Sequence, residues 1–600
     1  MCGLACIFSY GPHAPGVNKE ELLRIRERMF KRGPDSSGTW ISNDNRIGLA
    51  HRRLSILDIS DEGNQPMLDE NTGNRIIFNG EIYNFRELRS NLELQGHNFR
   101  SQSDTEVLLK LYTTYGEKML GMLRGMFAFV IWDEAKKGIF VARDHFGIKP
   151  LYIADDGNTL RFASQVKALL AGDSIELSME PAGHVGFLLW GYIPEPFTMF
   201  KGIRAVPAGT SIWVDCEGKR RYNEYFNLAE EYSKNLSLGK KISAENKKER
   251  LHEALLDTVR HHLITDVPLG VFLSAGLDSS SIANLAVESG EKNLSTLTLG
   301  FEEFIGTAND EVPLAEMFSK YLGTRQQTHR ISSEGFSEQY DDLLDAMDQP
   351  SIDGVNTFFI CKAAKEAGLK VTLSGLGGDE LFGGYSYFQK IPKIMRISNP
   401  FHHFPRLGRD FRKITAPFFR KYGSPKIAGL LEYGSDYAGA YFLSRSHYMP
   451  WEASEILGKD LFKEGWDALQ TLPELRQTLG SLDTNRTAIS ALELQWYMKS
   501  QLLRDSDWAS MAHSVEVRVP FVDIELFREV TMLIGSGFSP DKLDMATACK
   551  NMLPQSVLNK PKTGFSIPVQ KWLMGENRTI ENQGKHDLRL WSEIIYKSFT

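Results

Sequence analysis

The chain begins Met1-Cys2-Gly3-Leu4-Ala5-Cys6-Ile7-Phe8, an apolar run in which a cysteine directly follows the initiator methionine. Because small second residues permit removal of the methionine, Cys2 is expected to become the N-terminal residue. Such a cysteine combines a nucleophilic thiol with an α-amine that can act as its base. The alternative interpretation is a small buried residue at the start of a strand. The motifs that follow decide between the two.

Length and composition narrow the classes of protein that fit. The 600 residues are more than one hydrophobic core usually holds. A composition of 42% hydrophobic and 24% charged residues is typical of a globular protein. A net charge of −7 gives no basic signature for a nucleic-acid partner. Five cysteines without a CxxC pair argue against disulfides and zinc, so we expect a cytoplasmic location. The first residues lack the basic-then-apolar pattern of a signal peptide, and no apolar run reaches the roughly 18 residues of a transmembrane segment, so we expect neither.

The first third of the chain has many short strand-like runs, broken by Gly, Asn and Asp, and two amphipathic helical stretches. This pattern predicts two sheets packed face to face with helices outside. The helices are expected at 19–31 and 105–115. The strands are expected at Ile47–Ala50, Arg75–Phe78, Phe127–Trp132, Gly138–Ala142, Leu151–Ile153 and Leu160–Ala163.

Polar clusters recur at the ends of these strands. Asn79-Gly80 alone is typical of a hairpin turn. Next to a nucleophile, however, the Asn side chain and the Gly N–H supply the two donors that an oxyanion hole needs. Arg53 can pair with a carboxylate, and Glu81 and Asp104 can bind an ammonium group. These groups together suit an amino-acid substrate.

The order of these clusters carries a specific resemblance. Cys2, Arg32-Gly33-Pro34-Asp35, 51–56 (HRRLSI), 79–84 (NGEIYN), 103–106 (SDTE), 125–129 (GMFAF) and 142–152 (ARDHFGIKPLY) resemble the class II glutamine amidotransferases, over essentially all of residues 1–205. The resemblance implies an αββα N-terminal-nucleophile (Ntn) hydrolase sandwich. It also implies that Cys2 attacks the glutamine side-chain amide and releases ammonia, with Asn79 and Gly80 as oxyanion hole. Arg53, Glu81 and Asp104 would hold the glutamine. Arg32 and Asp35 are either supporting residues or a structural Arg–Asp turn.

A polar, Lys/Glu-rich stretch follows the first third. We predict a first domain at 1–215, a linker at 216–245 and a second domain at 246–600 that starts in a helix at Asn246–Thr265.

The stretch Gly270–Ser281 (GVFLSAGLDSSS) passes from an apolar strand through a small-residue loop into a helix. Converging backbone N–H groups and the helix dipole make this an anion site. The chain has no GxxxxGK[ST] motif. SAGLDSS instead resembles the pyrophosphate loop of the N-type ATP pyrophosphatases, in which a Gly stands at the position of Ala275. We expect Ala275 to need only a right-handed or extended backbone.

Two further strands point to the same nucleotide site. The run Ser295–Gly300 is a candidate strand on the adenine side, and the run Val371–Tyr385 leads from a strand into a loop of small and acidic residues. The carboxyl ends of parallel strands meet at one edge of a doubly wound sheet. Asp278 and Asp379 are hard oxygen ligands suited to Mg²⁺ on phosphates, although each alone could be a helix N-cap.

Later motifs extend the resemblance to about residues 1–575. The stretches 514–523 (SVEVRVPFVD) and 560–565 (KPKTGF) are similar to the glutamine-hydrolysing asparagine synthetase family. The family implies an adenine nucleotide α-hydrolase (ATP pyrophosphatase) sheet with helical additions, and a possible homodimer. It implies that ATP adenylates an acceptor carboxylate, by default aspartate, and that ammonia then forms the amide. The implied ATP and pyrophosphate residues are Leu273, Ser274, Gly276, Asp278, Ser279, Leu299, Ser374, Gly375 and Lys542.

Two positions depart from the aspartate-using members. Leu376 stands where those members carry a glutamate that assists proton transfer, and leucine cannot move a proton. Asp353 lies in a stretch that carries an arginine in those members, and an acid there does not favour an acidic acceptor. An alternative acceptor is therefore a sugar uronate or a natural-product or polysaccharide intermediate.

The stretch 389–426 carries ten Lys and Arg residues against a single acid, Asp410, with six aromatic residues between them. One interpretation is a solvated helical insertion over the active site. The other is a basic, aromatic surface for an anionic acceptor or for peripheral membrane contact.

Together these motifs predict two coupled reactions, with an apolar passage for ammonia between them. Two other classes were weighed. A ligase with a vestigial glutaminase half would have lost part of the glutamine site, and a non-catalytic relative would have lost Asp278 or Asp379; all of these residues are present.

Overall fold

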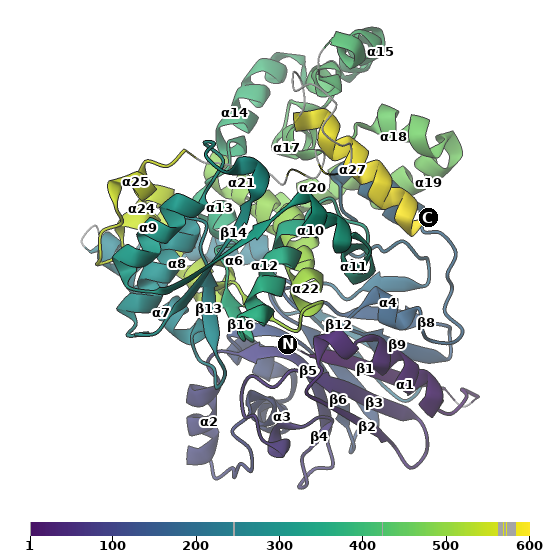
Figure 1. Ribbon diagram of the computed structural model, residues 1–600. Helices are drawn as coiled ribbons and strands as arrows, with labels where there is room; N and C mark the ends of the chain where they lie inside the picture. The colour runs from purple at the N-terminus through teal and green to yellow at the C-terminus, as the bar shows by residue number, and fades with distance from the viewer. Residues whose placement is uncertain are drawn as a thin grey trace.

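The computed structural model describes residues 2–11, 13–243, 246–422, 424–561, 568, 572 and 584–600. Figure 1 shows an N-terminal layered sheet structure at the bottom of the view, with a helix-rich half above it. Within the described residues, two six-stranded sheets form the lower part and one five-stranded sheet forms the upper part. Of the motif 560–565, residues 562–565 lie outside the described residues.

The two N-terminal sheets are antiparallel throughout. The first has the order β10 (Ile203–Ala205), β8 (Tyr152–Asp155), β9 (Thr159–Ala163), β1 (Gly3–Ser9), β3 (Ile47–Arg53), β2 (Ser36–Ile41). The second has the order β12 (Arg220–Glu224), β11 (Thr210–Val214), β7 (Gly138–Arg143), β6 (Gly125–Asp133), β5 (Arg75–Ile82), β4 (Met67–Leu68).

Strand β1 shows why these sheets stack. Leu4, Cys6 and Phe8 pack between the two sheets, whereas Ala5 and Ile7 face α1 (Lys19–Arg28) on the outside. Side chains alternate along a strand, so an apolar strand buried on both faces needs a layer on each side. Helices α2 (Phe85–Leu94) and α3 (Asp104–Tyr115) cover the outer face of the second sheet. The expected αββα order of layers is confirmed.

The third sheet is parallel and has the order β15 (Arg325–Ile331), β14 (Ser295–Phe301), β13 (Leu269–Phe272), β16 (Val371–Leu373), β17 (Glu516–Arg518). Its central strand β13 comes first in the chain, and the order runs outward from it in both directions. This is the doubly wound arrangement expected from the sequence, in which the loops after β13 and β16 lie at a switch point. The parallel sheet with helical additions is confirmed.

Helices surround this sheet. The principal ones are α7 (Lys247–His262), α8 (Leu277–Glu288), α9 (Val312–Leu322), α12 (Val355–Glu366), α22 (Arg504–Met511) and α23 (Ile524–Gly535). The short α13 (Gly378–Phe382) and α24 (Lys542–Thr547) lie beside the loops at the carboxyl edge, and α11 (Tyr340–Ala346) lies beside the N-terminal half. The remaining helices include α4 (Val166–Leu169), α5 (Pro181–Trp190), α17 (Tyr437–Arg445), α21 (Asn485–Leu492) and α27 (Gly584–Phe599).

The span 216–245, expected to be a linker, contains two elements. Strand β12 pairs with β11, and α6 (Leu228–Gly239) packs on α23, where a Cβ on Gly239 would meet the Met532 carbonyl oxygen at 2.0 Å. The span is therefore folded onto both halves and does not run free between them.

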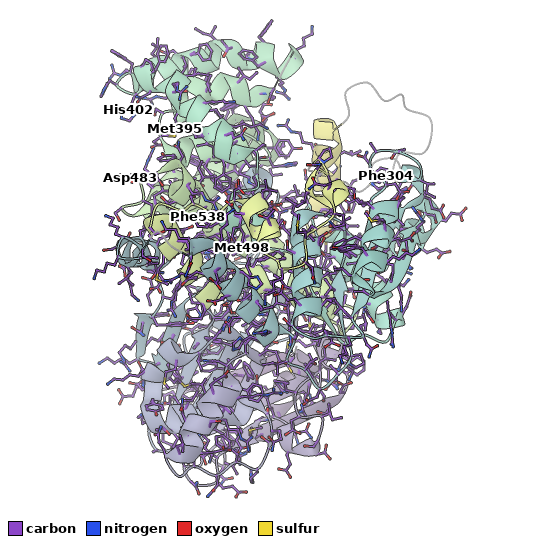
Figure 2. The ribbon with its side chains drawn as sticks, turned by 90° about the vertical axis from the view of Figure 1, so that its left-hand side faces the viewer. Phe304, Met395, His402, Asp483, Met498 and Phe538 are labelled. Carbon is purple, nitrogen blue, oxygen red and sulfur yellow. The ribbon has the colours of Figure 1, made fainter. Side chains whose placement is uncertain are left out.

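Helices α14 (Tyr387–Ser398) and α15 (Pro405–Tyr422) occupy the stretch expected to be a helical insertion. They project at the top of the view in Figure 1, and Figure 2 shows Met395 and His402 at the same end of the molecule.

Candidate functional sites

Cys2 lies at the start of β1, buried between the two halves of the chain. Its nitrogen donates a hydrogen bond of 2.9 Å to the side-chain oxygen of Asn79. After removal of Met1 this nitrogen is the α-amine. Burial raises the pKa of the Cys2 thiol, and the backbone of Leu54 and the charge of Arg53 oppose that rise. The thiol therefore needs a base, and the amine is on the same residue.

The side-chain amide of Asn79 lies next to the Cys2 nitrogen. Because the Cys2 N–H donates to Asn79, the atom facing it is the oxygen, and the NH₂ group points the other way. That nitrogen is fully buried and has no hydrogen-bond partner within the described part of the chain. A buried donor without a partner is costly, and a developing oxyanion would satisfy it.

Gly80 follows Asn79 in β5 and has no room for a side chain. A Cβ at this position would lie 2.0 Å from the carbonyl oxygen of Met126 on the neighbouring strand. Glycine therefore lets β5 and β6 approach closely next to Asn79.

Arg53 ends β3 as a buried cation held by neutral oxygens. Its guanidinium donates to the carbonyls of Ser60 (2.8 Å), Leu57 (3.3 Å) and Asp58, and to the side-chain oxygen of Asn64 (3.1 Å). Among the described residues no carboxylate forms an ion pair with it. Its charge is thus oriented but not neutralised, as a site for a substrate carboxylate requires.

Glu81 and Asp104 lie close enough for the charge of Asp104 to act on the Glu81 carboxyl group. Asp104 accepts a 2.9 Å hydrogen bond from the Ile82 backbone, and burial, reinforced by the charge of Glu516, raises its pKa to about 6. Burial and Glu516 also raise the pKa of Glu81, which Arg518 opposes from 3.6 Å. An ammonium group between these carboxylates would relieve their repulsion.

Glu516 and Arg518 were not predicted as site residues, although the motif 514–523 contains them. Arg518 is fully buried in β17 and pairs with Glu516 at 2.7 Å. Its carbonyl oxygen accepts a 2.9 Å hydrogen bond from the nitrogen of Ser374, in the loop after β16. One residue of the second half therefore contacts both predicted sites.

Arg32 and Asp35 do not pair with each other. Arg32 donates to the carbonyl oxygen of Cys2 at 3.0 Å and holds Asp507 with two bonds of 2.6 and 3.0 Å. Asp35 accepts from the Ser55 backbone and pairs with Lys370, both at 2.8 Å. The Arg–Asp turn considered from the sequence is not formed, and Arg32 instead joins the Cys2 backbone to Asp507 across the junction.

The loop after β13 leads into α8 as expected. Ser274 and Ser279 are joined by a 3.1 Å contact between their hydroxyl groups, and Gly276 is the N-cap of α8. The expectation for Ala275 is wrong, since its φ of 52° is left-handed. A residue other than glycine is strained in this conformation by about 1–2 kcal/mol, because its Cβ crowds the following carbonyl oxygen.

The two predicted metal ligands face each other through a lysine. Lys542 of α24 is bonded to Asp278 and lies 3.1 Å from Asp379. These two carboxylates raise the pKa of Lys542 against the effect of its burial. The described residues contain no group of three or more metal-ligating side chains, so a cation here would take its other ligands from phosphate and water.

Glycines let the loops close around these aspartates. A Cβ on Gly378 would meet the Asp278 carboxylate at 2.3 Å, and one on Gly384 would meet the Asp379 carboxylate at 2.0 Å. Gly375 approaches the Asp278 Cβ as closely as 2.7 Å by the same measure. Two hard oxygens held by a close-fitting backbone suit Mg²⁺ bound to phosphates.

The other predicted ATP residues end neighbouring strands. Leu273 follows β13, Ser374 and Gly375 follow β16, and Leu299 lies near the carboxyl end of β14. Lys560 was not predicted as a site residue; its ammonium donates to the Ser274 carbonyl at 2.9 Å and to Glu311 at 2.6 Å.

Comparison with known proteins agrees with both halves. Residues 1–226 match the glutamine amidotransferase domain family and residues 250–597 match the asparagine synthase family. Asparagine synthetase (glutamine-hydrolyzing) 1 of Bacillus subtilis is 32% identical over 604 residues, covering 97% of this chain and 89% of that protein. The chain belongs to the glutamine-hydrolysing asparagine synthetase family. The resemblance seen in the sequence, the ligase class and glutamine-dependent amidation are thereby confirmed.

More distant relatives of this asparagine synthetase family member include both asparagine synthetases and a protein named as an amidase. Asparagine synthetase (glutamine-hydrolyzing) 3 of Bacillus subtilis is 28% identical, covering 94% of this chain and 88% of that protein. Amidase chry2 of Gibberella zeae is also 28% identical, covering 95% of this chain and 90% of that protein.

The region around the two departures from the family pattern is rich in aromatic and acidic groups. Arg445 lies 3.7–4.6 Å from the ring centres of Tyr385, Tyr387 and Tyr497 and donates to Glu493 at 3.0 Å. Burial raises the pKa of Asp353, while the Gly354 N–H and the charge of Arg445 oppose that rise.

Glu380 lies in the same region and accepts a 2.7 Å hydrogen bond from Tyr385. Burial and the neighbouring Asp379 raise its pKa to about 7. Arg445, the cation whose charge acts on Asp353, is thus already paired with Glu493.

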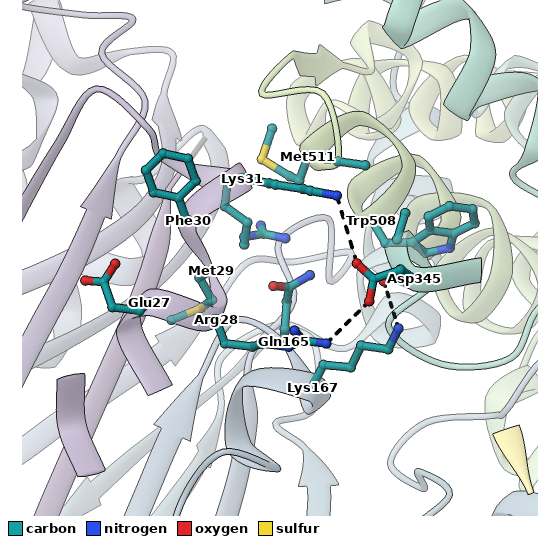
Figure 3. Close-up of a pocket in the computed structure, with 13 residues that line it drawn as sticks. Glu27, Arg28, Met29, Phe30, Lys31, Gln165, Lys167, Asp345, Trp508 and Met511 are labelled. Atoms are coloured by element: carbon teal, nitrogen blue, oxygen red, sulfur yellow. Dashed lines mark hydrogen bonds and ion pairs between the residues drawn. The ribbon is translucent and has the colours of Figure 1, made fainter. Parts of the chain in front are cut away.

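A separate pocket lies at the junction of the halves. It encloses about 260 Å³ and is lined by residues of α1, α11 and α22 and by Arg32. Figure 3 shows Asp345 at its side, in contact with Arg28, Lys31 and Lys167. None of the residues predicted to bind glutamine or ATP lines it.

Among the described helices none combines the length and the apolar character needed to cross a membrane.

Proposed function

We propose that residues 1–215 hydrolyse glutamine and residues 246–600 use the ammonia to amidate a carboxylate activated by ATP. Cys2 attacks the glutamine amide, with its own α-amine as base, and forms a thioester that water hydrolyses. Asn79 and Gly80 donate to the oxyanion. Arg53 holds the carboxylate of glutamine, and Glu81 and Asp104 hold its ammonium group.

The observation that carries this proposal is the unsatisfied amide nitrogen of Asn79. Its oxygen is fixed by the nitrogen of Cys2, so the orientation of the unpartnered NH₂ group is set by the nucleophilic residue itself before substrate binds. Asn79→Ala is expected to lower kcat for glutamate release about 10²–10³-fold, with a smaller change in KM. Asn84→Ala, just after the end of β5 and hydrogen-bonded to the backbone of Met122 and Arg124, is the matched control. A kcat for Asn79→Ala equal to that of the control would contradict the assignment.

In the second half, ATP binds at the carboxyl edge of the parallel sheet. The loop 274–279 and the start of α8 hold the phosphates, with Leu273, Leu299, Ser374 and Gly375 around the nucleotide. Mg²⁺, held by Asp278 and Asp379, would neutralise charge on the phosphates. Lys542 then turns to the leaving pyrophosphate, and ammonia displaces AMP from the acyl-adenylate to leave the amide.

Aspartate is the first candidate acceptor, because the family is named for it. A non-aspartate carboxylate, such as a sugar uronate or a biosynthetic intermediate, is the second candidate. Three features favour the second: Leu376 cannot move a proton, Asp353 is a half-buried acid, and Arg445 is already paired with Glu493.

An acceptor screen separates the two candidates. Pyrophosphate release is measured with ATP and glutamine across aspartate and a set of uronates, and again with Cys2→Ala and ammonium chloride so that the donor half is not needed. Aspartate-dependent pyrophosphate and asparagine at equal stoichiometry would exclude the second candidate. Release with a uronate and none with aspartate would exclude the first.

An apolar passage for ammonia, a homodimer and a cytoplasmic location stay predictions. The last is supported by the five cysteines, which are all free thiols.

A further inference from the structure

The projecting helices α14 and α15, residues 387–422, are here called the arm. The arm begins two residues after Tyr385 and eight residues after Asp379, so it is joined directly to the loop that carries the predicted ATP site. Figures 1 and 2 place it at the end of the molecule opposite the N-terminal sheets.

Helix α15 exposes an apolar stripe. Leu407, Phe411, Ile414 and Phe418 follow the spacing i, i+4, i+7, i+11, which places them on one face of a helix. The exposed fractions of Leu407, Ile414 and Phe418 are 50%, 78% and 59%, and Phe404, one turn earlier, is 60% exposed. Buried apolar faces stabilise most helices, so an exposed one of this length marks an interaction surface.

The stripe is exposed because a different face of α15 packs on the protein. Gly408 lies against the backbone of Leu431, and Arg412 pairs with Glu432 and lies over the ring of Trp451. The orientation of the helix is therefore fixed by these contacts, and the stripe is not an unpacked core.

Positive charge borders the stripe. Arg406, Arg409, Lys413 and Arg420 follow the spacing i, i+3, i+7, i+14 and occupy the adjoining face. Arg420 pairs with Glu455, and α15 contains a single acid, Asp410. Along the whole arm the exposed cations are Lys390, Lys393, Arg396, Arg406, Arg409, Lys413, Arg420 and Lys421.

We propose that the arm binds the surface of an anionic lipid membrane, with the stripe in the acyl boundary and the cations at the headgroups. An exposed stripe of Phe, Leu and Ile bordered by Lys and Arg is the pattern by which a helix lies in the plane of a bilayer interface. A nucleic acid or an acidic peptide would use the cations but leave the stripe in water. The proposal is independent of the acceptor, and it places the ATP site on the membrane side of the enzyme.

The test uses the full-length protein and vesicle co-sedimentation. Vesicles of phosphatidylcholine alone are compared with vesicles that contain 30 mol% phosphatidylglycerol (roughly the anionic content at which polybasic segments bind). Binding is expected only to the anionic vesicles and should weaken in 0.5 M salt. Arg406→Gln/Arg409→Gln/Lys413→Gln should weaken it about a hundredfold, at about fivefold per cation. Leu407→Ser/Ile414→Ser/Phe418→Ser should weaken it at least about tenfold.

Matched controls change exposed residues of the same kinds elsewhere. Lys240→Gln/Lys241→Gln/Lys248→Gln and Leu94→Ser/Leu177→Ser/Leu238→Ser should bind like the unchanged protein. All four variants should keep glutamate release from glutamine, which shows that they are folded. Absence of binding by the unchanged protein, or equal loss in the controls, would overturn the proposal. So would binding to heparin and polyglutamate without binding to vesicles, which would indicate an acidic macromolecule.

Discussion

The proposed glutamine site and the proposed ATP site hold buried charge in opposite ways. Around Cys2, the guanidinium of Arg53 is held by neutral oxygens and the amide nitrogen of Asn79 has no partner among the described residues. At the edge of the parallel sheet, Lys542 joins Asp278 to Asp379. The proposed glutamine site therefore presents oriented groups that a ligand can bind directly. In the proposed ATP site, a bound cation would replace an ion pair within the protein.

Ligand binding therefore requires more rearrangement of the protein at the second site than at the first. In the proposed function, glutamine enters contacts that are already oriented, whereas magnesium and pyrophosphate would displace the Lys542 ammonium from two carboxylates. Four predictions test this contrast, in order of decreasing effect.

Cys2→Ala should separate the sites completely. Without the thiol no thioester forms. Glutamate release, and with it the amide formation that depends on glutamine, should therefore fall by about a thousandfold or more. Ammonia-dependent amide formation should be kept, because the ATP site is untouched. Loss of both activities would mean that the two sites are not separable in this way.

Asp379→Asn should have the complementary effect. Loss of one carboxylate from the cation site should lower pyrophosphate release about a hundredfold with either nitrogen source, while basal glutamate release stays within about twofold. Asp410→Asn, an exposed acid on the arm, is the control and should change neither rate. Raising the magnesium concentration should partly restore Asp379→Asn if the carboxylate holds the metal.

Lowering the pH should weaken the binding of glutamine at its proposed site. The pKa of Asp104 is raised to about 6, and only its ionised form attracts an ammonium group, so binding is favoured above that pH and lost below it. The kcat/KM for glutamine should fall about tenfold per pH unit below about 6.

Asp104→Asn should have a low kcat/KM without that acidic limb. If the limb persists in this variant, it belongs to another group. Glu81, whose pKa is also raised, and Glu516 lie nearest and would be substituted next.

Ala275→Gly should give the smallest effect. Glycine adopts the left-handed backbone of position 275 without strain, so the free energy of unfolding should rise by about 1 kcal/mol. Ala286→Gly, within α8, should lower it by about 1 kcal/mol or more. Urea denaturation of both variants checks the sign, and equal destabilisation would argue against strain at Ala275.

Much of this arrangement could be predicted from local pattern. The strands around 75–78 and 127–132 and the helix at 105–115 follow from apolar periodicity, and the cluster of Asp278 and Asp379 follows from the rule that parallel strands end at one edge. The left-handed φ of Ala275 could not be predicted, because one residue name does not fix a loop conformation. Nor could the contacts of Arg518 with Glu81 and Ser374 be predicted, since residues far apart in the chain meet only through tertiary packing.

The buried ion pairs across the junction have a consequence for dissecting the enzyme. Arg32 with Asp507 and Arg124 with Asp523 each join the first half to the second, almost entirely out of water. Removing one partner of such a pair typically costs about 3–5 kcal/mol, because the other charge stays buried alone. Cutting the chain between residues 216 and 249 would do this at several places at once. Each half therefore needs the other to pair its buried charges. Co-expression of the two fragments should recover more folded protein than expression of either alone.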